Sequence, residues 1–110
     1  MINELAATLR IHISITLLTT GLGLLAAALT SLSYLPQVRK ALPRGSTHDL
    51  SLKTLFALTA GLILWCVYGL VRGDYVIVLA NVTGAGLTGI VFICKWRDVK
   101  SEKPSKRYPR

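Results

Sequence analysis

The sequence predicts an all-α integral membrane protein with three transmembrane helices, and two observations support this. The 110 residues are 52% hydrophobic and only 16% charged, which is too apolar for an ordinary small soluble domain. Asp, Glu, Lys and Arg are also absent from three long runs, Ile11 to Val38, Thr54 to Val71 and Tyr75 to Cys94. At about 1.5 Å per residue each run can cross a hydrocarbon core roughly 30 Å thick, the second being near the lower limit.

The three runs divide the chain into an N-terminal extension (1–14), a three-helix unit (15–96) and a basic tail (97–110). The predicted helices cover about residues 15–41, 52–71 and 75–95. The polar, turn-rich loop after the first helix offers Asp49 or Ser51 as the cap of the second.

The first apolar run has an alternative interpretation as a cleaved secretory signal. Arg10, the apolar stretch and the small residues Ala26 to Ala28 resemble the three regions of such a signal. Glu4 dilutes the positive region, however, and cleavage would leave Pro36 and Gln37 on a short tail before two spans. We therefore expect the N-terminal extension to continue the first helix on its outer side.

The net charge of +8 is explained by topology, without a nucleic-acid partner. Of the 13 Lys and Arg residues, 11 lie in the first loop or after the third run, which three spans place on one side. Only Arg10 and Arg72 lie opposite. The positive-inside rule then predicts an outer N-terminus and a cytoplasmic C-terminus, in the cell inner (plasma) membrane. The basic tail is expected to attract anionic membrane lipids.

A proline and an amide interrupt the first run. Pro36 has no N–H for the carbonyl of Leu32 and its ring crowds that group, so a helix through this point is bent or hinged. Pro36 and Gln37 are therefore the predicted hinge, with a kink that only shapes packing as the alternative. The same helix carries a stripe of small and polar residues at helical spacing, which includes Gly23, Ala27, Thr30, Tyr34 and Gln37.

An aromatic ring and an amide are predicted at one depth in the second and third helices. Trp65 and Asn81 are equally far in sequence from Gly73, so in an antiparallel pair both lie roughly 10 Å below the outer turn. A ring that packs on C–H groups and an amide that bonds hydroxyls suit a polar, hydroxyl-rich ligand. A packing tryptophan beside an interhelical amide bond is the alternative.

Further candidates are predicted from their positions along the second helix and its turn. Leu58, Trp65, Tyr68 and Arg72 share one helix face, and Tyr68 and Arg72 are four residues apart at the outer end. Together with Asp74 in the outer turn, we expect Leu58, Tyr68 and Arg72 to be gate residues. An aromatic belt at the membrane boundary is the alternative for Tyr68.

The remaining reactive residue types do not form a catalytic or metal-binding pattern in the sequence. His12 and His48 are predicted on opposite sides of the membrane, and Cys66 and Cys94 near opposite ends of their spans. We therefore predict no enzymatic activity, no metal and no cofactor.

The order and spacing of these residues resemble the bacterial SemiSWEET sugar transporters of the PQ-loop group, over about Gly21 to Lys95. The matching features are Gly23, Thr30, Tyr34, the pair Pro36-Gln37, Ser51, the Trp65-x-x-Tyr68-Gly69 signature and Asn81.

The resemblance implies a three-helix unit that dimerises in parallel, so that two protomers form one six-helix transporter. It also implies that Trp65 and Asn81 contact the sugar, and that the Pro36-Gln37 pair lets the first helix bend as the inner side opens. Tyr34 matches a position near the inner constriction and joins the gate candidates.

The leading functional hypothesis is a homodimeric uniporter that moves mono- or disaccharides down their gradient by alternating access. The charge-free runs supply no carboxylate for ion coupling. Two alternatives remain open, a transporter of another small polar solute such as an amino acid, and a scaffold subunit that transports nothing. A four-helix multidrug exporter fits poorly because the sequence lacks a fourth span and an intramembrane glutamate.

The charge bias makes a direct prediction about topology. In intact cells, the Asn3→Cys variant should react with a membrane-impermeant thiol reagent and the Ser101→Cys variant should be shielded, because the basic residues keep the C-terminal side in the cytoplasm. The unmodified chain is the control for Cys66 and Cys94. The reverse labelling pattern would contradict the predicted orientation.

Overall fold

The computed structural model describes residues 1–101, which form three α-helices and no strand. The helices are α1 (Ile2–Ala41), α2 (Leu52–Arg72) and α3 (Tyr75–Ser101). Each is long and apolar enough to cross a membrane. The predicted all-α, three-span fold is therefore confirmed, while the part of the basic tail at residues 102–110 lies outside the described residues.

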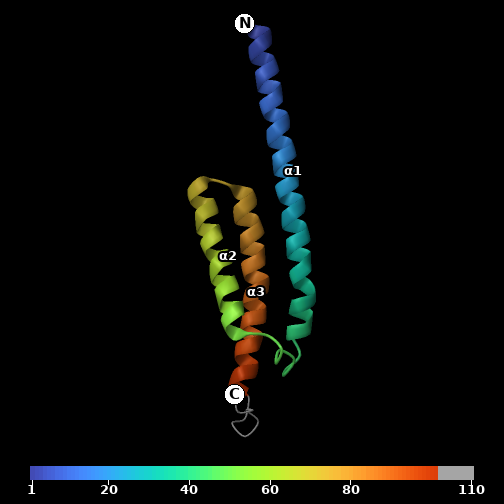
Figure 1. Cartoon of the computed structure of the whole chain (residues 1–110), viewed down its shortest axis with the longest axis vertical. Coiled ribbons are helices and arrows are strands. Elements are labelled where there is room, and N and C mark those ends of the chain that lie inside the picture. The colour runs from blue at the N-terminus through green and yellow to red at the C-terminus, as the bar shows by residue number, and fades with distance from the viewer. Residues whose placement is uncertain (102–110) are drawn as a thin grey trace.

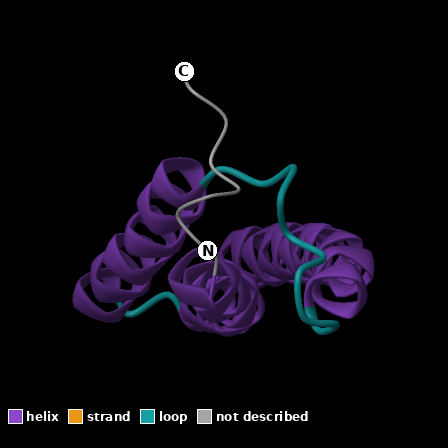
Figure 2. Ribbon diagram, turned by 90° about the horizontal axis from the view of Figure 1, so that it is seen from below, coloured by secondary structure: helices purple, strands orange, loops and turns teal. Residues whose placement is uncertain are grey.

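The spatial order of the helices differs from their order in the chain. α3 contacts both other helices, whereas α1 and α2 make no close backbone contact, so α3 lies in the middle (Figures 1 and 2). We call the end that carries the 42–50 loop the loop end, and the end where α2 turns into α3 the turn end. Figure 1 shows α1 extending well beyond the turn end.

Two helices are longer than the sequence patterns predicted. α1 begins at Ile2 and not near residue 15, so the N-terminal extension continues the first helix, as expected. Residues 2–14 contain no glycine or proline to end it, and Glu4 lies favourably in its first turn. Its 40 residues make it about 60 Å long. α3 runs to Ser101, past the predicted end near residue 95, and residues 96–101 likewise contain no helix breaker.

One serine side chain and one glycine define the two ends of α2. Ser51, not Asp49, is the cap, and its Oγ accepts a hydrogen bond of 3.2 Å from the N–H of Thr54. At the other end Gly73 has φ 68°, a left-handed conformation that favours glycine. The N–H groups of Gly73 and Asp74 donate to the carbonyls of Leu70 and Gly69, at 3.2 and 2.9 Å, which completes a Schellman motif.

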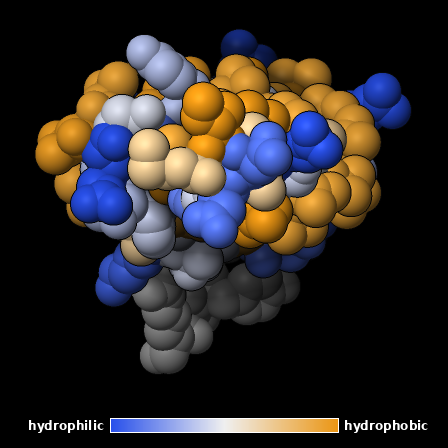
Figure 3. Space-filling view, turned by 90° about the horizontal axis from the view of Figure 1, so that it is seen from above, coloured by the Kyte–Doolittle hydropathy of each residue, from blue (hydrophilic) through white to orange (hydrophobic). Residues whose placement is uncertain are grey.

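The buried apolar core lies at the loop end. It consists of Ala41, Leu55, Val91 and Cys94, with Val38, Leu50 and Phe92 packed against it. Since these residues come from all three helices and the loop, they join the three helices at the loop end. Elsewhere most large apolar side chains are exposed, and Figure 3 shows them around much of the rim, as suits a surface that faces lipid.

Gly69 allows the close approach of α2 and α3. A β-carbon added there would lie 2.8 Å from Cγ2 of Ile77 and 3.1 Å from the backbone nitrogen of Val78. Because backbone cannot yield as a flexible side chain does, Gly69→Ala should force the helices apart.

We expect Gly69→Ala to lower the free energy of unfolding by about 1–3 kcal/mol, the usual cost of overpacking. Thermal unfolding of the detergent-solubilised protein measures the effect. Gly61→Ala is the matched control, because an added β-carbon there meets no atom within 4 Å. Equal stability of the Gly69→Ala variant and the control would contradict the close-approach role.

Candidate functional site

A groove with a volume of about 320 Å³ lies between α1 and α3 and is bordered by α2. Small residues on the two facing helices provide the space. The lining residues are Gly23, Ala26, Ala27, Thr30 and Tyr34 of α1, Leu62 of α2, and Val76, Ile77, Ala80, Asn81 and Gly84 of α3. Much of the predicted small and polar stripe of α1 therefore faces this groove.

Two glycines bring the walls of the groove together. A β-carbon on Gly23 would lie only 2.8 Å from Cγ1 of Val76, so α1 and α3 approach closely there. A β-carbon on Gly84 would lie 3.4 Å from both the Tyr34 ring and a Leu62 methyl group. Tyr34 and Leu62 thus meet over Gly84 and form the wall nearest the loop end.

Asn81 is the most polar side chain in the wall. Its Nδ2 donates a hydrogen bond of 2.8 Å to the carbonyl of Ile77, one turn earlier in α3. Within residues 1–101 its amide oxygen accepts no hydrogen bond, and one N–H is also left over. The half-buried amide therefore retains one acceptor and one donor for a ligand in the groove.

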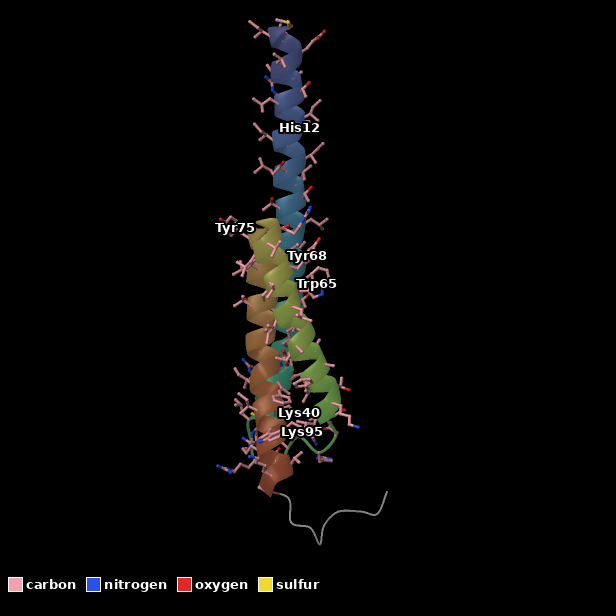
Figure 4. All side chains as sticks on the ribbon, turned by 90° about the vertical axis from the view of Figure 1, so that its left-hand side faces the viewer. His12, Lys40, Trp65, Tyr68, Tyr75 and Lys95 are labelled. Atoms are coloured by element: carbon pink, nitrogen blue, oxygen red, sulfur yellow. The ribbon has the colours of Figure 1, made fainter. Side chains whose placement is uncertain are left out.

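Trp65 lies outside the groove in the single chain. Its side chain is 53% exposed, and its ring meets Tyr68 edge-on with centroids 5.3 Å apart (Figure 4). Because Trp65 follows the groove-lining Leu62 by three residues, it occupies the adjoining face of α2, roughly 60° around the helix. A single chain does not bring Trp65 and Asn81 into one pocket.

The predicted gate residues have different surroundings. Tyr34 lines the groove, whereas Leu58, Tyr68 and Arg72 lie exposed on α2. Asp74 stabilises the helix start, because its Oδ1 accepts hydrogen bonds from the N–H groups of Val76 and Ile77 at 3.1 and 3.2 Å. It thereby caps the start of α3.

The predicted hinge residues lie between the groove and the loop end. α1 stays helical through Pro36, and both Pro36 and Gln37 are exposed. Tyr34 in the groove wall is two residues before the proline, and the buried Ala41 is five residues after it. Pro36 therefore separates the groove-lining part of α1 from its packed end.

A polar network at the loop end was missed by the sequence analysis. The Asp98 carboxylate accepts hydrogen bonds from the Gly45 N–H at 3.0 Å and from the hydroxyl and N–H of Thr47 at 2.6 and 3.2 Å. Arg97 donates to three carbonyls around the end of α1, and Lys95 donates to the Thr47 carbonyl at 2.9 Å. Basic residues for which the sequence indicates only a topological role thus also bind the loop.

A second ionic contact on the loop is exposed. Lys40 and Asp49 form an ion pair whose side chains are 52% and 46% exposed. The hydrogen bond from Lys40 lowers the pKa of Asp49, so the pair is kept until the pH falls through that lowered value. Its exposure makes this contact a weak contributor to stability.

Comparison with known proteins first identifies the class. A family model described as the PQ loop repeat matches residues 18–78, more than half of the chain. This chain, whose three helices are each long and apolar enough to span a membrane, is therefore a member of the PQ-loop group.

Individual relatives identify the family within the PQ-loop group more closely. The sugar transporter SemiSWEET of Leptospira biflexa is 38% identical over 74 residues, which cover 67% of this chain and 87% of that protein. The proteins of the same name from Bradyrhizobium diazoefficiens and Escherichia coli are 36% and 31% identical, over 69% and 71% of this chain and 88% and 85% of theirs. Among solved structures, none matches.

The chain therefore belongs to the SemiSWEET family within the PQ-loop group. This confirms the resemblance found in the sequence. It also confirms that the chain is not an enzyme, because the named relatives are transporters.

Proposed function

We propose that this protein moves mono- or disaccharides down their concentration gradient by alternating access, as a homodimer. The observation that carries the proposal is the groove between α1 and α3, where the Asn81 amide offers a donor and an acceptor. The groove volume of about 320 Å³ falls at the lower end of the range for small-molecule sites. Three relatives that match most of the chain bear the name of sugar transporters.

A second copy of the chain completes the proposed pathway. Three helices are too few to surround a sugar, whereas two copies related by an axis along the membrane normal supply six. The exposed face of α2 that carries Trp65 adjoins the groove and has no cover within the described chain. Facing a partner across the axis, each protomer contributes one Trp65 and one Asn81 to a shared site.

The groove favours a sugar over an amino acid. All of its lining residues are uncharged, so neither the carboxylate nor the ammonium group of a zwitterion finds an ionic partner. A sugar requires only what the groove supplies, hydrogen bonds for its hydroxyls and apolar surface for its C–H groups.

Downhill movement is supported by the positions of the acidic residues. Asp74 and Asp98 lie near the two ends of α3, and each already accepts hydrogen bonds from the protein. No acidic residue lines the groove to bind a coupling ion. We further propose location in the inner (plasma) membrane, with the turn end outside and the loop end in the cytoplasm.

The decisive experiment is uptake of labelled glucose and sucrose into liposomes that contain only this protein. Sugar that equilibrates without an ion gradient would support a uniporter. Absence of uptake of both sugars, together with uptake of a labelled amino acid, would favour the other-solute alternative. Absence of uptake of any solute by a folded dimer would favour the scaffold alternative.

Trp65→Ala and Asn81→Ala test the substrate site. The first removes a packing face and the second removes hydrogen bonds, each worth about 1–3 kcal/mol when buried. Each change should therefore weaken sugar binding about 5- to 150-fold.

Sugar affinity is measured on purified variants alongside their size-exclusion profiles. A folded dimer is expected in both cases, because in the proposed dimer both residues line the shared site and not a helix seam. Wild-type affinity in well-folded variants would remove both residues from the site.

Pro36→Ala tests the hinge. Alanine restores a backbone donor and should stiffen α1, so sugar uptake should slow more than sugar binding weakens. Uptake rate and affinity are measured on the same preparation. Unchanged values for both would make Pro36 a packing kink.

A further inference from the structure

Arg97 supplies the hydrogen-bond donors that the end of α1 lacks. The last carbonyl groups of a helix have no partner within the helix. Nη1 of Arg97 donates to the Leu42 carbonyl at 2.9 Å, and Nη2 donates to the carbonyls of Ala41 and Pro43, each at 3.1 Å. The planar guanidinium fork therefore ties the end of α1 to α3.

Asp98 ties the following loop to the same point of α3. Its carboxylate accepts hydrogen bonds from the N–H of Gly45 and from both the N–H and the hydroxyl of Thr47. Thr47 is fully buried. Nε of Arg97 also donates to Asp98 at 2.9 Å, so the two side chains hold one another in place. Together with the bond from Lys95, seven hydrogen bonds join the end of α1 and the loop to α3.

The apolar core lies immediately next to this network. Ala41, Val91 and Cys94 are buried together with Leu55 of α2. We use the name loop-end base for this core and the network together, that is, residues 38, 41–43, 45, 47, 50, 55, 91, 92, 94, 95, 97 and 98. The α1 residues that line the groove, by contrast, all precede Pro36 in the sequence, whereas Ala41 and the loop follow it.

We propose that Arg97 and Asp98 are positioning residues that keep the loop-end base closed through the whole transport cycle, so that bending at Pro36 moves the groove-lining part of α1 against a fixed base. The inference rests on the proposed transport function. It differs from a gate that opens by releasing the end of α1 from α3. When the transport pathway opens on the loop side, the gap then forms between the loop-end bases of the two protomers.

The strength of the network supports a permanent base. Every bond from Arg97, Asp98 and Lys95 to the loop involves a charged group, which is the stronger class of hydrogen bond. Opening the base in each cycle would break seven of them and expose the buried Thr47. Bending at Pro36 breaks none of them, because this residue lies outside the network.

A reversible cross-link distinguishes a permanent base from one that opens. Thr47 and Asp98 touch through Oγ1 and Oδ2 at 2.6 Å, so Thr47→Cys and Asp98→Cys place two thiols side by side. In a background with Cys66→Ser and Cys94→Ala, a short bis-methanethiosulfonate reagent joins them and a reductant releases them.

We expect the cross-linked protein to take up labelled glucose within about twofold of the background protein, since a permanent base does not move. The released form, which lacks the Asp98 contacts, should be slower by about 2- to 30-fold, the range for residues that act through others. Its glucose affinity should stay unchanged. An unfolded variant would lose glucose binding, so unchanged affinity shows that the slower uptake does not come from loss of folding. Cross-linked protein without uptake, or equal uptake in both forms, overturns the proposal.

Arg97→Lys provides a second test that does not depend on the cysteine pair. Lysine keeps the charge but loses the fork that reaches three carbonyls, so glucose uptake should slow while glucose affinity stays the same. The paired variant Lys40→Gln with Asp49→Asn is the control, because it removes an exposed contact of the same loop. Unchanged uptake in Arg97→Lys, or equal slowing in the control, contradicts the proposal.

The unmodified protein in the same liposomes separates this proposal from the proposed function. If it moves no sugar, the transport function fails, and amide hydrogen exchange at Gly45 and Thr47 still tests the base. Slow exchange in the unmodified protein and faster exchange in Arg97→Lys support a closed base, whereas fast exchange in both contradicts it.

Discussion

Every backbone polar group within a bilayer needs a partner from the protein, and this constraint organises the whole chain. Long helices satisfy it along their length, but each helix end leaves several groups unbonded. Here Ser51 and Asp74 cap two helix starts, and the Schellman turn at Gly73 closes the end of α2. The C-terminal end of α1 is completed by Arg97, from a distant part of the chain.

Helix packing is uneven along the molecule for a related reason. Lipid tails are as apolar as leucine, so burial of leucine does not by itself draw helices together, and close approach at small residues does. Gly69 brings α2 against α3, while Gly23 and Gly84 bring α1 and Tyr34 against α3. The largest apolar core forms at the loop end, beside the polar network. The groove lies where small residues leave space between α1 and α3, in the part that changes shape in the proposed transport cycle.

The proposed function follows from this division between the packed loop end and the groove. A transporter needs a site that can face either side of the membrane and a part that stays fixed while it does so. The Asn81 amide lies in the groove wall, and the network of Arg97 and Asp98 lies at the loop end. Pro36 separates the two along α1. In the proposed transport cycle, bending of α1 at Pro36 leaves this network intact.

The sequence alone determined the number of spans and the fold class, because charge-free runs and turn residues are local signals that hydrocarbon thickness makes decisive. It also indicated that Asn81 and the small-residue stripe of α1 face a polar or closely packed interior, since an amide inside an apolar run stands out by itself. The tertiary structure decided that α3 lies between α1 and α2, and that Trp65 stays outside the groove of one chain. It also brought Thr47 and Asp98 together. Those outcomes depend on which helix faces meet across long sequence separations, and neither periodicity nor charge counts contain that information.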